Sequence, residues 1–175
     1  MKRATYLLLF LVGVWSGCSV FMWQVAIQNF AVAERLSVSS DEGLRDAVQG
    51  LSADSLRSAF RYQASEVNRL FFRVWGWVQL PIAVSLLLLV WMARSGTVPV
   101  VMAGVMLLIA VGLAAHVVPE TIRLGRLIDF AAESSLPDVR NSFWALHHTY
   151  TALDMLKVLL GLGVAGIAWR HARAS

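Results

Sequence analysis

The sequence predicts an all-α fold: an integral membrane four-helix bundle with short amphipathic periplasmic helices. Hydrophobic residues make up 58% of the 175 residues and charged residues only 15%, and the mean hydropathy is +0.64. A soluble domain of this size carries about 25% charged residues. The hydrophobic residues also gather into blocks of about 20, the length that a helix needs to cross a bilayer. We therefore expect residues 1–175 to form a single transmembrane domain.

Four apolar blocks are expected to cross the membrane, at about residues 6–27, 75–92, 98–118 and 150–169. None alternates polar and apolar residues as a strand does, and a helix satisfies its backbone groups within lipid. Most of the tryptophans lie at or near the ends of these spans, where amphipathic rings anchor helices at the membrane surface. Two long connections remain, at about residues 29–70 and 119–149.

The distribution of charge predicts the orientation in the membrane. The two termini and the link between the second and third spans carry basic residues and no acid, namely Lys2, Arg3, Arg94, Arg170 and Arg173. All eleven acidic residues belong to the long connections and the helix ends that flank them. The positive-inside rule then places both termini in the cytoplasm, with the protein in the inner membrane of a bacterium.

The same charges bear on possible partners. Because the net charge of +4 is explained by the orientation, and no basic cluster with interleaved aromatic residues is present, we expect no binding to nucleic acid. The expected environment is the lipid bilayer, and a second membrane protein or another copy of the chain remains a possible partner.

Helical spacing of apolar residues extends into the long connections. Ser40 and Ser52 each precede acidic residues and are expected to cap helix N-termini. We expect two short amphipathic helices, joined near Gly50, that lie over the periplasmic mouth of the bundle. The connection at 119–149 carries charges of both signs at helical spacing and is expected to be partly helical with local ion pairs.

The N-terminus also allows a second interpretation. The sequence Trp-Ser-Gly-Cys at 15–18 resembles the processing site of a bacterial lipoprotein, in which Cys18 would become a lipidated N-terminus. The apolar stretch continues to Ile27, however, whereas the hydrophobic part of a signal peptide is about 7–15 residues long. The favoured interpretation is a complete span in which the lone Cys18 is a packed small residue.

The fourth span is the most informative about function. Only twelve uncharged residues separate Lys157 from Arg170, which as a helix cover about 18 Å of a hydrocarbon core of about 30 Å. The span must therefore include Asp154 and Lys157, which are three residues apart and can neutralise each other. With His147 and Thr151 they form a predicted polar stripe inside the bundle, because ionisable groups at such depth usually face the interior. The alternative is that Lys157 extends toward the periplasmic surface while Asp154 lies near the lipid headgroups.

An alternative for this end of the bundle is a haem or metal site. His116 ends the third span, and His147 and His148 open the fourth, so all three are expected at the periplasmic level. Two imidazoles on facing helices can hold a haem, and imidazoles also bind copper or zinc. We take a hydrogen-bonded packing role as the more common one for such histidines, and predict no cofactor.

Recognisable catalytic motifs are absent from the sequence, so we expect a protein that is not an enzyme. The glycines at 161, 163 and 166 have the spacing of a dinucleotide-binding loop but lie within an apolar helix. They are expected to let a neighbouring helix approach closely. Gln24 and Gln79 are expected to point inward, with Pro81 as a kink.

Two segments carry a family resemblance. His116–Arg123 and Phe143–Lys157 resemble the second half of a little-characterised four-helix membrane family that includes transmembrane protein 205. In that family a proline turn follows the third span, and a Phe-x-x-x-His segment, here Phe143 to His147, enters the fourth. The first span is similar more loosely. The connection at 29–70 departs from the family, since the usual Ala-Pro exit from the first helix is missing.

This resemblance implies a fold and a location but no reaction. A copper-resistance membrane family is a weaker look-alike, and its Met-rich periplasmic ligands are missing here. The sequence therefore leaves three hypotheses: a non-enzymatic inner-membrane protein whose polar stripe holds the helices together or lines a solute or partner site, a haem- or copper-binding protein, and an accessory subunit of a larger membrane complex.

Overall fold

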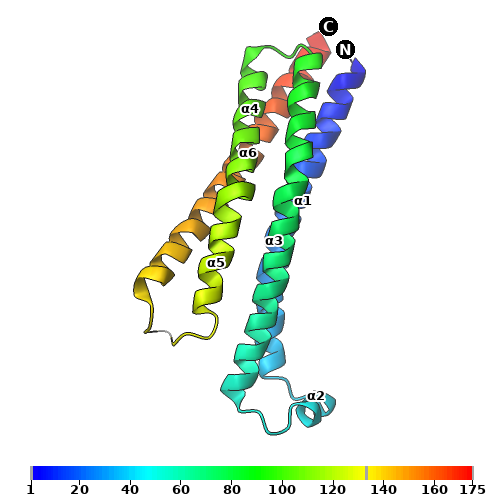
Figure 1. Ribbon diagram of the computed structural model, residues 1–175. Coiled ribbons are helices and arrows are strands. Elements are labelled where there is room, and N and C mark those ends of the chain that lie inside the picture. Colours follow the sequence, from blue (N-terminus) through cyan, green and yellow to red (C-terminus); the bar gives the residue numbers. More distant parts are fainter. Residues whose placement is uncertain (1, 133, 175) are drawn as a thin grey trace.

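The fold is known from a computed structural model that describes residues 2–132 and 134–174 (Figure 1). The described elements are α1 (Lys2–Ser37), α2 (Glu42–Ala47), α3 (Ala53–Met92), α4 (Thr97–Gly112), the π-helical segment η1 (Leu113–Val117), α5 (Val118–Ile128) and α6 (Pro137–Ala174). The predicted all-α class and the bundle of four long apolar helices are confirmed.

In the part of the chain that the structure describes, four helical segments are long and apolar enough to cross a membrane. They are α1, α3, the continuous run from α4 through η1 to α5, and α6. Both ends of the chain lie at the same end of the bundle, beside the turn between α3 and α4 (Figure 1). Many large apolar side chains face outward from these segments, for example Phe10 at 69% exposed and Leu108 at 72%. A surface of this kind suits contact with lipid tails.

The first long connection takes a form that differs from the expected one. Instead of two short helices over the mouth of the bundle, α1 continues to Ser37 and α3 begins at Ala53, with only the six-residue α2 between them. Ser52 caps α3 as expected, accepting a hydrogen bond from the Ser55 amide at 3.1 Å, but the cap of α2 is Asp41 and not Ser40. The α1–α3 hairpin therefore extends beyond the turn that joins α5 to α6 (Figure 1).

A π-helical segment carries the third span through Pro119. Proline lacks the amide hydrogen that an α-helix requires and clashes with the carbonyl one turn earlier. The five residues of η1 widen the helix just before this point, and the helix then continues as α5. The turn expected at Pro119 is thus replaced by a continuous helix, and His116 lies within η1.

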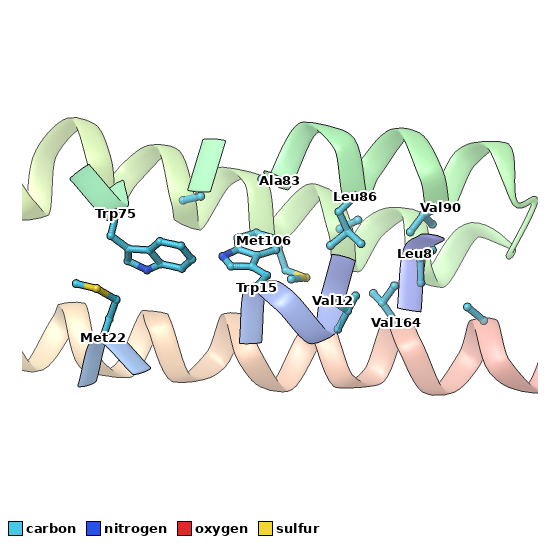
Figure 2. Close-up of a cluster of buried hydrophobic side chains, with 13 residues drawn as sticks. Leu8, Val12, Trp15, Met22, Trp75, Ala83, Leu86, Val90, Met106 and Val164 are labelled. Carbon is cyan, nitrogen blue, oxygen red and sulfur yellow. The ribbon is translucent and has the colours of Figure 1, made fainter. Parts of the chain in front are cut away.

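The core of the bundle is apolar and lies among all four long helices (Figure 2). Leu8, Val12 and Trp15 of α1 pack with residues of α3, α4 and α6. Close approach depends on small residues: a Cβ at Gly161 of α6 would lie 3.2 Å from the Met106 Cε atom and 3.5 Å from Val12. This agrees with the predicted role of the glycines at 161 and 163, whereas a Cβ at Gly166 meets nothing within 4 Å.

Candidate functional site

Asp154 and Lys157 lie inside the bundle, where each is only 1% exposed. Because they are three residues apart on α6, they share one face of the helix, and the Lys157 ammonium forms an ion pair with the Asp154 Oδ1 atom. Three helical turns, or about 15 Å, separate Lys157 from His147, and about 20 Å separate it from Arg170. The pair thus lies well away from both ends of α6.

The direction of the lysine side chain follows from helix geometry. Side chains in an α-helix tilt toward its N-terminus, so Lys157 reaches back over the turn that carries Asp154. Its ammonium also donates to the Oε1 atom of Gln79 in α3. Gln79 is completely buried, as the sequence predicts, so its amide is available only to groups inside the bundle. Gln24, by contrast, is exposed, and its predicted inward orientation is wrong.

Two tryptophans of α1 complete the site. The Trp23 indole N–H donates to the Asp154 Oδ2 atom at 2.9 Å, and the Trp15 indole N–H donates to Gln79 Oε1 at 3.4 Å. The Lys157 nitrogen also lies 5.2 Å from the centre of the Trp15 ring, within the range of a cation–π interaction. We call Trp15, Trp23, Gln79, Asp154 and Lys157 the polar cluster; it joins α1, α3 and α6.

The polar cluster is electrically balanced. It contains one carboxylate and one ammonium, and each carboxylate oxygen of Asp154 receives a donor from a different side chain. An isolated charge at this depth would carry a desolvation cost of several kcal/mol, which a well-bonded partner offsets. The arrangement is that of a neutralised ion pair shared among three helices.

Two buried polar atoms in or beside the polar cluster have no hydrogen-bond partner among the described residues. They are the hydroxyl oxygen of Ser19 and the Nε2 atom of Gln79, and the indole nitrogen of Trp75 is in the same state further along α3. Ser19 also borders a small cavity together with Lys157 and Trp15. The cavity has room for about one water molecule.

The other two members of the predicted stripe lie elsewhere. His147 and Thr151 are exposed, and the Thr151 hydroxyl donates to the His147 backbone carbonyl of its own helix at 3.0 Å. The His147 ring packs beside Phe143 and Trp144, with ring centres 6.1 and 5.5 Å away. The structure therefore brings Asp154 and Lys157 together inside the bundle and leaves His147 and Thr151 on its surface.

The remaining candidate ligands are also on the surface. His116 and His148 are exposed, and the part of the chain that the structure describes holds no group of three or more His, Cys, Asp or Glu side chains suited to a metal. Cys18 lies in the middle of α1, partly buried against the apolar core. The haem or copper hypothesis stays a prediction that these positions do not test.

Sequence reasoning missed Trp15 and Trp23 as site residues. Both belong to the predicted first span, and Trp15 lies in its middle rather than at an end. An indole N–H inside lipid needs a hydrogen-bond acceptor. This requirement could have identified the two tryptophans as candidate site residues. Gln79 and Asp154 are polar acceptors predicted on other spans, so a pairing could have been proposed, although not which tryptophan meets which group.

A second set of charged groups joins α3 to α5 at the end of the bundle opposite the termini. The Arg69 guanidinium binds both carboxylate oxygens of Asp129, at 2.6 and 2.8 Å, and also binds Glu66 at 2.6 Å. The Arg69 and Asp129 side chains are 11% and 9% exposed. Gly125 makes room for this contact, because a Cβ there would lie 2.9 Å from the arginine. Such a two-bond contact fixes the relative position of both helices.

In comparisons with known protein families, with curated proteins and with solved structures, nothing matches the chain. The four candidate spans of the fold themselves define the class, a multi-pass membrane protein. The resemblance to the family of transmembrane protein 205 stays a prediction from the sequence.

Proposed function

We propose that the chain is a non-enzymatic integral protein of a bacterial inner membrane whose polar cluster holds α1, α3 and α6 in one arrangement. One observation carries this proposal: Asp154 and Lys157 are almost fully buried and receive their partners from two other helices. Helices in lipid have no hydrophobic driving force to associate, so interhelical hydrogen bonds and packing determine how they assemble.

The geometry favours this holding role over a solute site. The charges of Asp154 and Lys157 neutralise each other, and the space beside them accommodates about one water molecule. A solute would have to separate the ion pair and widen the bundle before it could bind. The cavity that Lys157 lines is likewise too small to bring a substrate against the ion pair.

A charge-removal cycle tests the holding role. Asp154→Leu and Lys157→Met each leave an uncompensated buried charge, and each is expected to lower the free energy of unfolding by about 3–5 kcal/mol. The double variant removes both charges and is expected to recover most of that loss. Unfolding of the purified protein in detergent measures all three. If the double variant loses as much free energy of unfolding as the two single variants lose together, the proposal is contradicted.

Labelling of single cysteines tests the proposed orientation. Basic residues Arg3, Arg94, Arg170 and Arg173 are exposed near the end that holds both termini, which supports a cytoplasmic location under the positive-inside rule. In a Cys18→Ser background, Ser40→Cys is expected to react with a membrane-impermeant maleimide in spheroplasts. Arg173→Cys is expected to react only after lysis. The reverse pattern would overturn the orientation.

The protruding α1–α3 hairpin favours a second candidate function, an accessory subunit of a larger membrane complex. The hairpin ends in α2 beyond the rest of the bundle (Figure 1) and exposes Val38 at 77% and Leu51 at 56%. A photo-crosslinking residue at Leu51 is expected to form an adduct of one defined mass in cells. The same probe at the outward-facing Leu108 is the control, and equal behaviour at both sites would count against a specific partner.

An absorption spectrum and metal analysis of the purified protein address the remaining hypothesis. A Soret band or stoichiometric copper that is lost on His116→Ala would assign the chain to haem binding or metal handling. We expect a colourless preparation without copper.

A further inference from the structure

The cavity beside the polar cluster lies between α1, α4 and α6. Its lining consists of three polar side chains and four others, namely Ser16, Ser19 and Lys157 with Val12, Trp15, Met106 and Val158. Gly161 helps to keep it open, because a Cβ at that position would approach Val12, Ser16 and Met106 at once. Its size is that of about one water molecule.

Ser19 has a hydroxyl that the protein itself does not satisfy. The residue is 0% exposed, and within residues 2–132 and 134–174 its oxygen has no hydrogen-bond partner. Serine and threonine in helices usually bond to the backbone carbonyl one turn earlier, as Thr149 does to Ala145 at 2.8 Å. Ser19 makes no such bond. An unpartnered hydroxyl inside a membrane cannot reach bulk water, so the absence of a partner carries a free-energy cost.

Lys157 lines the same cavity, and its ammonium also lies 5.2 Å from the centre of the Trp15 ring. An ammonium group carries three N–H donors. Two of them are used, because the structure gives Lys157 two oxygen acceptors, Asp154 Oδ1 and Gln79 Oε1. The third has no oxygen acceptor among the described residues. One small molecule in the cavity that can both accept and donate hydrogen bonds would give a partner to the Lys157 ammonium and to the Ser19 hydroxyl.

We propose that the cavity binds one water molecule, which accepts a hydrogen bond from the Lys157 ammonium and bonds to the Ser19 hydroxyl. Buried waters typically make about three hydrogen bonds, and Ser16 supplies a third polar group on the same wall. The ligand must be neutral, because Asp154 already balances the charge of Lys157. This inference rests on the cavity and its polar groups and is independent of the holding role of the polar cluster.

The direction in which Ser19→Ala shifts the melting temperature tests the proposal. If the cavity is dry, Ser19→Ala removes a hydroxyl without a partner and leaves the melting temperature equal or higher. If a water is bound, the same change removes one of its partners, and the melting temperature is expected to fall by about 2–4 °C. Ser85→Ala, on the outward face of α3, controls for the change in helix propensity. An unchanged or raised melting temperature, relative to that control, would overturn the proposal.

A spectroscopic test observes the contact directly in the folded protein. The chain has only two lysines, Lys2 and Lys157, so Lys2→Arg leaves a single lysine to be labelled with nitrogen-15. In lipid bilayers, solid-state nuclear magnetic resonance is expected to show magnetisation transfer from water to the Lys157 nitrogen. Gly161→Ala, which narrows the cavity without removing a polar group, is expected to reduce that transfer. If the Lys157 signal is visible by direct excitation but receives no magnetisation from water, the proposal is overturned, whatever the stability of Ser19→Ala.

Discussion

Trp23 of α1 donates its indole N–H to the carboxylate of Asp154 in α6 at a distance of 2.9 Å, across 131 residues of sequence. The Asp154 oxygen that accepts this bond is the one that Lys157 does not use. The first and last spans therefore share one carboxylate, and the buried charge depends on both. Loss of either donor would leave an oxygen of that carboxylate without a partner.

Trp23→Phe tests this contact because it keeps an aromatic ring and removes only the donor. A hydrogen bond to a charged group contributes about 1.5–3 kcal/mol, and we expect a loss of that size in the free energy of unfolding. Trp77→Phe is the matched control, since Trp77 is 62% exposed on the outside of α3. Unfolding followed by circular dichroism in detergent measures both, and equal losses would show that the Trp23 effect comes from packing alone.

The membrane class and the burial of Asp154, Lys157 and Gln79 could be predicted from the sequence. The fourth apolar stretch is too short to cross without the charged pair, and helical spacing puts both charges on one face. The same spacing places His147 near that face, yet His147 is exposed. Figure 1 shows that α6 diverges from α1 toward the α5–α6 turn, so α1 does not accompany this part of α6.

Other parts of the structure depend on contacts that periodicity does not reveal. The π-helical segment before Pro119 and the continuous helix beyond it replace an expected turn, because widening one turn of helix accommodates the proline ring. The long α1–α3 hairpin likewise depends on pairing between distant residues, such as the bond from Asn29 to Asn68 at 2.6 Å. Local sequence signals mark where a helix can begin but not which helix it will pair with.

Two ion pairs of α5 are predicted to differ in their contribution to stability. Asp129 binds Arg69 of α3 through two hydrogen bonds in a largely buried place, whereas Glu120 binds Arg123 of its own helix at the surface. We expect Asp129→Ala to lower the free energy of unfolding by about 1.5–3 kcal/mol, because it leaves the guanidinium partly unpaired. Glu120→Ala is expected to cause no measurable change, since solvent screens exposed pairs. Thermal unfolding compares the two, and similar shifts would contradict the assigned difference.

The turn between α3 and α4 is predicted to require glycine at position 96. Gly96 precedes α4 with φ at +94°, a conformation that residues with a side chain adopt at a cost of about 1–3 kcal/mol. Gly96→Ala is expected to destabilise the protein by that amount. Gly104→Ala is the control, because Gly104 lies inside α4 with open space around its Cβ position and is expected to gain about 0.4–1 kcal/mol. The melting temperatures should therefore move in opposite directions.

Substitution of a glycine of α6 by leucine is predicted to lower stability at position 161 but not at position 166. A Cβ at Gly161 already lies 3.2 Å from Met106 and 3.5 Å from Val12, so a leucine must displace residues of both α4 and α1. Overpacking of this kind typically costs about 1–3 kcal/mol, and Gly161→Leu is expected to lose stability accordingly. Gly166 faces outward with nothing within 4 Å, so Gly166→Leu adds only surface for lipid. Thermal unfolding of both variants in the same detergent measures the difference. Equal stability of the two would mean that α6 does not approach α1 and α4 at Gly161.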